Sequence, residues 1–155
     1  MTTIQASATD VISAPPAVVY GVLADYREGH PAILPPKYFR SLEVESGGLG
    51  DGTRIRVQVR SFGRVQTFRA VISEPERGRR LVETDPELGI VTTFTVEPAD
   101  DGRRAQVTIA TRYEKPGLAG RLEGLVAPAA LRTVYAAVLR QLDAVARDRT
   151  PHRTA

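Results

Sequence analysis

The sequence contains no cysteine and only two histidines among its 155 residues. Without cysteine the chain cannot form a disulfide, an iron–sulfur cluster or a thiolate zinc site. His30 and His152 lie far apart and outside any metal-binding motif, so we expect neither a metal nor a cofactor. The spaced glycines of phosphate-binding loops, dinucleotide-binding folds and serine hydrolases are also missing.

Long apolar runs and clusters of one charge are absent as well. No stretch approaches the ~20 consecutive apolar residues of a membrane span, and the first ten residues lack the basic start and apolar run of a signal peptide. The formal charge is +3, with 21 basic residues interspersed with 18 acidic ones. We therefore expect a cytoplasmic protein that has no stable membrane insertion and binds no nucleic acid.

What is present is a chain long enough for one domain with a real core. We expect this domain to span residues 1–148, followed by a disordered tail over residues 149–155. Its centre is a predicted helix over residues 117–147, ~45 Å long at 1.5 Å per residue. The apolar positions of this helix recur at helical spacing and form one stripe; they are Leu118, Leu122, Leu125, Leu131, Tyr135, Val138, Leu142 and Val145.

Alternating apolar and polar residues predict strands over most of the remaining chain. These strands cover residues 4–13, 38–46, 53–60, 64–73, 79–84, 88–97 and 104–114. Between the first two we expect a short helix from Pro15 to Ala24, because proline is tolerated in a first helical turn. A second short helix or irregular turn is expected over residues 26–34. Strands joined by tight turns predict an α+β fold rather than parallel βαβ units.

The two-residue turn Phe62-Gly63 fixes the register of one predicted hairpin. It places Val57 opposite Phe68, so that both strands bury their apolar faces together. The outer face of this hairpin carries four arginines that we expect to be solvated, namely Arg54, Arg56, Arg60 and Arg69. Arg56 would lie opposite Arg69, an unfavourable pair unless an acid intervenes.

Three segments carry a resemblance to a known superfamily: DVISAPPAVVYGVLADY (10–26), TFTVEPADDGRRAQVTI (93–109) and the closing amphipathic helix. With this order of elements the chain resembles the helix-grip or SRPBCC superfamily. That superfamily includes START lipid-transfer domains, pollen-allergen-like plant proteins and bacterial polyketide cyclase/dehydrase-like proteins. The resemblance implies a helix-grip fold: a curved antiparallel sheet of about seven strands around a long C-terminal helix, with two short helices after the first strand and an apolar cavity inside.

The expected ligand site lies on the inner faces of the strands and on the helix stripe. Ligand sites of this kind are mostly apolar with a few convergent polar groups. The candidate wall residues are Tyr26, His30, Tyr38, Val57, Phe68, Thr92, Phe94, Ile109, Thr111, Tyr113 and Tyr135. A buried tyrosine hydroxyl needs a partner, which Thr92 and Thr111 can supply. The alternative is that these residues form an ordinary core.

No catalytic motif is shared across the superfamily, so catalytic residues cannot be carried over. His30, in a Gly/Pro-rich segment, is a candidate general acid or base for an enolisation or an aldol-type ring closure, and Tyr113 is a second candidate. The alternative for His30 is a turn residue with a local hydrogen bond. The short strand 79–84 leaves the facing of Glu83 and Asp85 open, and we expect both to be solvated.

Pro128 falls inside the long predicted helix, where it removes the hydrogen bond to the carbonyl of Gly124. We expect a kink there that shapes the mouth of the pocket. The alternative is a helix that begins only near Pro128, with residues 117–125 forming a separate turn.

Three functions are compatible with these features. The first is binding or transport of a small hydrophobic molecule, such as a lipid or polyketide, in the internal cavity. The second is a metal-free polyketide cyclase, aromatase or dehydratase that uses the same cavity and gains much of its rate from proximity. The third is a protein-interaction module that uses the outer arginine face. We therefore expect a small hydrophobic ligand as the partner, bound by a monomer or a homodimer.

Overall fold

The computed structural model describes residues 1–151, which form one seven-stranded antiparallel sheet, one long helix and two short helices. The elements in chain order are β1 (Thr2–Ile12), α1 (Pro16–Ala24), α2 (Gly29–Ala32), β2 (Phe39–Ser46), β3 (Arg54–Ser61), β4 (Arg64–Glu76), β5 (Arg80–Asp85), β6 (Ile90–Ala99), the 3₁₀ turn η1 (Asp100–Gly102), β7 (Arg104–Lys115) and α3 (Gly117–Arg149). The strand order is β1-β7-β6-β5-β4-β3-β2. The predicted α+β class, the strands and the helix order are confirmed.

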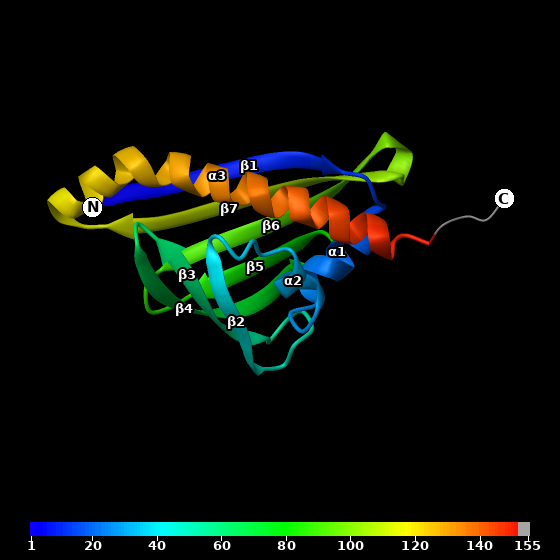
Figure 1. Cartoon of the computed structure of the whole chain (residues 1–155), viewed down its shortest axis with the longest axis horizontal. Coiled ribbons are helices and arrows are strands. Elements are labelled where there is room, and N and C mark those ends of the chain that lie inside the picture. Colours follow the sequence, from blue (N-terminus) through cyan, green and yellow to red (C-terminus); the bar gives the residue numbers. More distant parts are fainter. Residues whose placement is uncertain (152–155) are drawn as a thin grey trace.

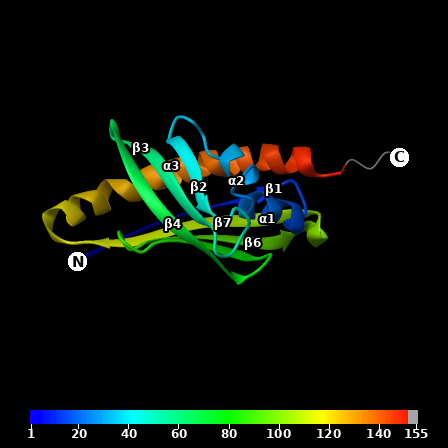
Figure 2. The ribbon, with the colours of Figure 1, turned by 90° about the horizontal axis from the view of Figure 1, so that it is seen from below.

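The sheet curves around α3, which lies along β1 and β7 (Figures 1 and 2). The strands β2, β3 and β4 turn away from the helix at the other side of the sheet. The short helices α1 and α2 lie beside the C-terminal half of α3. This is the helix-grip arrangement that the resemblance implied.

The hairpin between β3 and β4 has the predicted register. Val57 pairs with Phe68 and Ile55 pairs with Ala70. The turn residues Phe62 and Gly63 have φ angles of 50° and 73°, the left-handed pair that a tight two-residue hairpin requires. The register therefore follows from the turn, and it places the apolar residues of both strands on the concave side of the sheet.

The core is concentrated where α1, α2 and the C-terminal half of α3 meet the sheet. Its fully buried members include Ile12, Val19, Leu23, Ile33, Leu139 and Leu142. Helix α1 begins at Pro16, one residue after the predicted start, and contributes both Val19 and Leu23 to this core. One end of the space between the sheet and α3 is thus filled by side chains.

Helix α3 runs without interruption from Gly117 to Arg149 with Pro128 inside it, so the alternative of a helix beginning near Pro128 is wrong. The helix is bowed in both views (Figures 1 and 2). Arg149, expected in the tail, is the last residue of α3, and residues 152–155 of that expected tail lie outside the described residues.

The N-terminal half of α3 corrects the predicted stripe. Leu118, Leu122 and Leu125 do not face the sheet but are 71%, 58% and 78% exposed. Glycines face β1 and β7 instead. A Cβ on Gly120 would lie 2.2 Å from the carbonyl oxygen of Lys115, and one on Gly124 would lie 3.2 Å from the methyl group of Thr2. The helix approaches the sheet too closely there for leucine, so the leucines occupy its outer side.

By length and composition, α3 is also the one helix in residues 1–151 that could cross a membrane, although the sequence has no continuous apolar run that indicates a span. In the fold it is the central helix of a soluble domain, because Val138, Leu139, Leu142 and Ala146 pack into the core.

Candidate functional site

A cavity of about 950 Å³ lies between the concave face of the sheet and α3. Its walls come from strands β2 to β7 and from the helices α2 and α3, and most of the residues that line it are apolar. The predicted wall residues found in its lining are His30, Val57, Phe68, Thr92, Phe94, Ile109, Thr111, Tyr113 and Tyr135. The alternating inward positions of the strands were therefore read correctly from the sequence.

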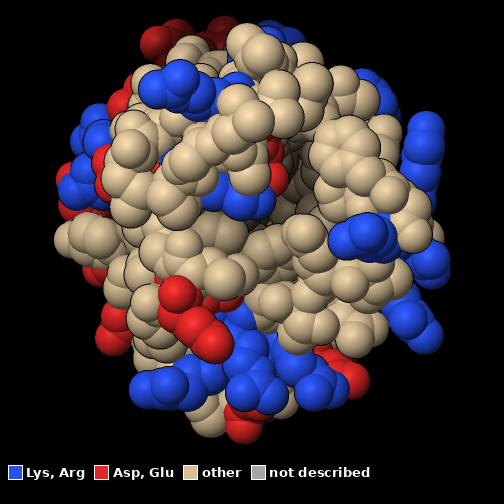
Figure 3. Space-filling view, turned by 90° about the vertical axis from the view of Figure 1, so that its left-hand side faces the viewer, with Lys and Arg blue, Asp and Glu red and all other residues tan. Residues whose placement is uncertain are grey.

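The cavity opens at the end of the molecule where α3 begins. The lining there includes Phe62 at the tip of the β3–β4 hairpin, Leu88 in the β5–β6 turn, and Lys115 and Glu123 near the start of α3. Figure 3 looks at this end and shows a hollow surrounded mostly by uncharged residues, with a few basic and acidic side chains at its edge. An apolar molecule can reach the cavity from this side.

Two predicted wall residues are placed elsewhere. Tyr38 is half-buried and has the ammonium group of Lys37 5.4 Å from its ring centre. Tyr26 is fully buried behind the cavity wall and donates its hydroxyl to Oε1 of Glu83 at 2.7 Å. Burial raises the pKa of Tyr26 well above its usual value, and the charge of Glu83 adds to the shift. Tyr26 therefore supports a wall residue rather than forming the wall.

A polar row crosses the concave face of the sheet. Glu83 on β5 pairs with Thr92 on β6, and Thr92 pairs with Thr111 on β7. The two threonine hydroxyls are 2.8 Å apart, and Tyr135 from α3 hydrogen-bonds to Thr111. Burial raises the pKa of Tyr135, although the threonine hydrogen bonds oppose this shift. The predicted partnership of threonines with a buried tyrosine is confirmed.

Glu83 corrects the expectation that it faces solvent. Its side chain lines the cavity and is 18% exposed. One oxygen, Oε1, accepts the hydroxyl of Tyr26 at 2.7 Å and lies 3.4 Å from Nε2 of His30. The alternation of β5 places Leu81, Glu83 and Asp85 on one face, and that face is the concave one.

His30 is 3% exposed. It lines the cavity, as one prediction had it, and it also makes a local hydrogen bond, as the alternative had it. Its Nδ1 lies 2.8 Å from the carbonyl oxygen of Leu23, and because a carbonyl only accepts, Nδ1 carries a hydrogen. Its ring stacks on Tyr26 at 4.4 Å between centroids and meets the ring of Phe94 edge-on at 5.4 Å. The imidazole is thus held rigidly, with its Nε2 side toward Glu83.

The turn before α2 holds His30 in this place. The carboxylate of Asp25 accepts backbone hydrogen bonds from Arg27, Glu28 and Gly29 at 3.1–3.2 Å. Burial alone would raise the pKa of Asp25, but these three bonds and the nearby Arg149 lower it below its usual value. An aspartate followed by a glycine four residues later is the signal in the sequence for this turn.

Asp85 also corrects an expectation of solvent exposure, because it is 5% exposed. Its Oδ1 accepts the backbone N–H groups of Glu87 and Leu88, both at 3.0 Å, and its Oδ2 accepts that of Arg69 at 3.1 Å. A side-chain carboxylate that satisfies backbone donors in a turn is a structural feature. Asp85 therefore closes the β5–β6 turn and ties it to β4.

Tyr113 lies nearer the mouth and has a different partner from His30. Its hydroxyl donates to Oε2 of Glu123 on α3 at 2.8 Å, and Lys115 contacts the other oxygen of Glu123 at 3.0 Å. Burial raises the pKa of Tyr113, and Glu123 adds to the shift. The structure does not bring the two candidate catalytic residues into one hydrogen-bonded group.

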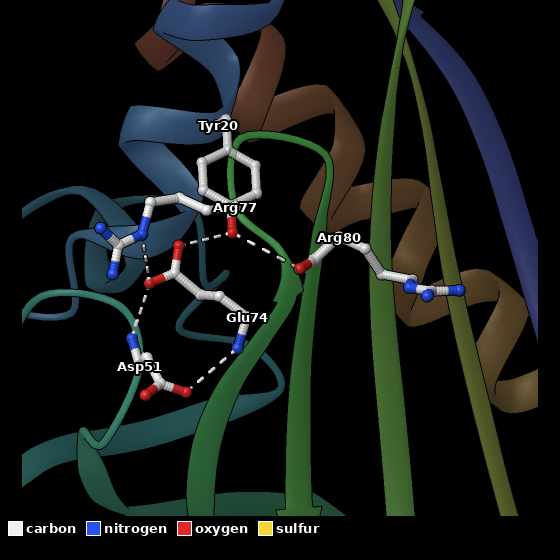
Figure 4. A network of polar contacts seen from close by, with 5 residues as sticks. All are labelled: Tyr20, Asp51, Glu74, Arg77 and Arg80. Carbon is white, nitrogen blue, oxygen red and sulfur yellow. Dashed lines mark hydrogen bonds and ion pairs between the residues drawn. The ribbon is translucent and has the colours of Figure 1, made fainter.

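A second polar network, which the sequence did not reveal, lies outside the cavity (Figure 4). Glu74 on β4 accepts the hydroxyl of Tyr20 at 2.7 Å and the backbone N–H of Asp51 at 2.8 Å, and Arg77 lies 3.6 Å away. Burial raises the pKa of Tyr20, and the hydrogen bond to Glu74 adds to it. This network fastens α1 and the loop before β3 to the β4–β5 hairpin.

Of the four arginines expected on the outer face, Arg54, Arg60 and Arg69 are exposed and Arg56 is half-buried. Arg60 also belongs to the lining of the cavity. Arg56 and Arg69 lie opposite each other, but Arg56 pairs with Glu43 and Arg69 pairs with Glu45 at 3.8 Å.

The chain matches the family model described as "Polyketide cyclase / dehydrase and lipid transport" over residues 3–147. It belongs to this family. The match covers the sheet, the cavity and nearly all of α3. Comparison with curated proteins gave no match.

Solved structures similar to this member of the family agree on the fold. The KanY protein is 28% identical, with a TM-score of 0.81 over 95% of this chain and 99% of its own. The protein TTHA0849 from Thermus thermophilus is 22% identical, with a TM-score of 0.79 over 95% and 99%. The Zhui aromatase/cyclase from a Streptomyces species, strain R1128, is 22% identical, with a TM-score of 0.69 over 95% of both chains.

The side chains that line the cavity allow only a few kinds of contact with a ligand. Apolar walls suit a hydrophobic molecule, and one group of polar side chains in the lining forms the row from Glu83 to Tyr135. Other polar and charged residues of the lining, such as Lys115 and Glu123, lie nearer the mouth. Glu83 and His30 offer a carboxylate and an imidazole side by side at one wall. The site can therefore bind an apolar body and contact one polar group on it.

Proposed function

We propose that the protein binds a small hydrophobic molecule, such as a lipid or polyketide, in the cavity between the sheet and α3. The observation that carries the proposal is the cavity of about 950 Å³. Protein interiors are normally close-packed, so a space of this size is not a packing accident. It lies at the upper end of the ~300–1,000 Å³ typical of small-molecule sites.

The position of the cavity supports the same proposal. The core is closed by α1, α2 and the C-terminal half of α3, whereas the cavity extends from this core to an open mouth. A ligand would bury its apolar surface against Ile55, Val57 and Phe94 and gain ~25 cal/mol for each Å² removed from water.

Titration with the neutral probe N-phenyl-1-naphthylamine tests the proposal. We expect its fluorescence to rise and saturate at one molecule per chain, and the melting temperature to rise with probe concentration. Ala70→Phe adds a ring inside the cavity and should weaken binding. Ala110→Phe makes the same change outside the cavity lining, opposite Thr93, and should not. Equal affinity in both variants, or no saturable binding, would overturn the proposal.

A second candidate is catalysis of ring closure or dehydration in the same cavity. The observation that favours it is the contact of Glu83 with His30 in an apolar wall, since a carboxylate there can remove a proton next to a ketone and return it. The test is deuterium incorporation from solvent beside the carbonyl of 2-tetralone, followed by NMR. If the protein catalyses the reaction, exchange will be faster with the protein than in buffer and slower with Glu83→Gln than with the wild type. Exchange at the buffer rate would rule out catalysis and leave ligand binding as the only proposed function.

A further inference from the structure

Two carboxylates on β5 face the cavity, and they differ in how their oxygens are used. Both oxygens of Asp85 accept backbone hydrogen bonds, so its acceptors are occupied. In Glu83 the contacts with Tyr26 and His30 both fall on Oε1. Residues 1–151 supply no hydrogen-bond partner for Oε2 of Glu83.

This unused oxygen is open to the cavity. Within residues 1–151, no side-chain oxygen that is sealed from solvent lacks a partner. Oε2 of Glu83 has no partner, so it is not sealed, and the cavity is the space that its side chain lines. Its position is also fixed, because Tyr26, behind the wall, and His30, in the wall, both contact the other oxygen.

The surroundings make this oxygen the strongest free acceptor at that wall. The hydroxyls of Thr92, Thr111 and Tyr135 are engaged with one another. The next pair along the same two strands, Leu81 and Phe94, is apolar and offers no acceptor. A ligand with its apolar body against these walls therefore meets one carboxylate oxygen.

We infer that Oε2 of Glu83 is a ligand subsite that accepts a hydrogen bond from a hydroxyl or amine group of the hydrophobic ligand. This inference rests on the proposed binding function and narrows the class of ligand. A phenol or alcohol donates to the carboxylate and replaces the water that otherwise solvates it. A ligand with only an ether at that position leaves a charged acceptor desolvated, which is unfavourable. A ligand with a carboxylate at that position also cannot donate, and its negative charge would be repelled by that of Glu83.

Three naphthalenes of nearly equal shape test the subsite by calorimetric titration of the full chain at neutral pH. They are 2-naphthol, which donates a hydrogen bond, 2-methoxynaphthalene, which cannot, and 2-naphthoate, which is an anion. We expect 2-naphthol to bind about tenfold or more tightly than 2-methoxynaphthalene, as a hydrogen bond to a charged group predicts. We expect 2-naphthoate to bind most weakly. This comparison needs no variant.

The variant Glu83→Gln assigns the preference to one side chain. Glutamine keeps the shape and can still accept the hydroxyl of Tyr26, so the fold should be retained, as its melting temperature will report. We expect the preference for 2-naphthol to fall to within about threefold and the binding of 2-naphthoate to improve. Glu97→Gln is the matched control, because it removes the same charge from an exposed side chain on β6, and it should retain the wild-type preference.

The outcomes separate this subsite from the binding function. If 2-methoxynaphthalene binds as tightly as 2-naphthol, or if Glu83→Gln keeps the preference, the subsite is wrong and the cavity proposal stands. If none of the three naphthalenes and no N-phenyl-1-naphthylamine binds, the proposed function itself fails. A loss of preference in Glu97→Gln as large as in Glu83→Gln would also overturn the subsite, since it would show a general effect of charge.

Discussion

The two halves of α3 belong to one continuous helix but make different contacts. In the C-terminal half, large side chains such as Leu139 and Leu142 are completely buried in the core. In the N-terminal half, glycines face the strands and the leucines point outward, with Leu122 58% exposed. The cavity mouth lies beside the second kind of packing. One half of the helix therefore holds the fold together, while the other borders the entrance to the site.

This difference shows what an apolar stripe does not reveal. Leucines at helical spacing predict which residues share a face, but not whether that face is the one against the sheet. Where Gly120 and Gly124 lie one turn apart, the backbone can approach the strands directly, and the glycines then define the packed face. The pattern of small residues was present in the sequence and competed with the pattern of large ones.

The largest expected effect contrasts two leucines of α3. Leu142→Ala should reduce the free energy of unfolding by about 2–5 kcal/mol, because it leaves a void in a closed core. Leu122→Ala should change it by about 0.5 kcal/mol or less, because the side chain is mostly exposed. Denaturant unfolding measures both. Similar losses in the two variants would break the contrast between the halves.

A smaller effect is expected from two glycine substitutions in helices. Gly120→Ala places a Cβ against the backbone oxygen of Lys115 and should destabilise the fold by about 1–3 kcal/mol. Gly21 in α1 has open space around its Cβ position, so Gly21→Ala should stabilise the fold by up to about 1 kcal/mol through helix propensity. Thermal unfolding of both variants shows whether each substitution raises or lowers the stability of the fold. Stabilisation by Gly120→Ala would mean that α3 does not approach the sheet this closely.

The smallest expected effect concerns pH and the C-terminal end of α3, where Arg149 lies 3.7 Å from Asp25. The pKa of Asp25 is lower in the folded chain than its ordinary value of 3.8. Its ionised form therefore stabilises the fold above pH 3.8, and this contribution is lost as the pH falls through the folded pKa. We expect the melting temperature of the wild type to fall more steeply below that pH than that of Asp25→Asn. Parallel curves for the two proteins would contradict this role.

The fold was largely predictable from the sequence because its signals are local. Alternation fixed the faces of the strands other than β1 and β5. Pro15 and Pro16 marked the start of α1, and Phe62-Gly63 set a hairpin register that depends only on turn geometry. The long helix was predicted from its periodicity. Only its packed face was assigned wrongly in the N-terminal half.

The site was predictable only in part because its key contacts are long-range. The inward positions of Thr92, Thr111 and Tyr135 followed from periodicity. Glu83 was missed because β5 is short and lacks clear alternation. Its partners Tyr26 and His30 come from α2 and the turn before it, more than fifty residues earlier in the chain. Such a contact depends on how the sheet curves, and no local pattern encodes that.

An apolar molecule that enters the space between the sheet and α3 would contact a fluorescent side chain placed at the cavity wall. The chain has no tryptophan, so Ala70→Trp introduces a single reporter at the cavity wall and Ala110→Trp introduces one outside the cavity lining, opposite Thr93. Titration with 2-bromonaphthalene, whose bromine quenches tryptophan fluorescence only at short range, tests the proposed binding directly. We predict saturable quenching in Ala70→Trp and little in Ala110→Trp; equal quenching in both, or none in Ala70→Trp, would contradict it.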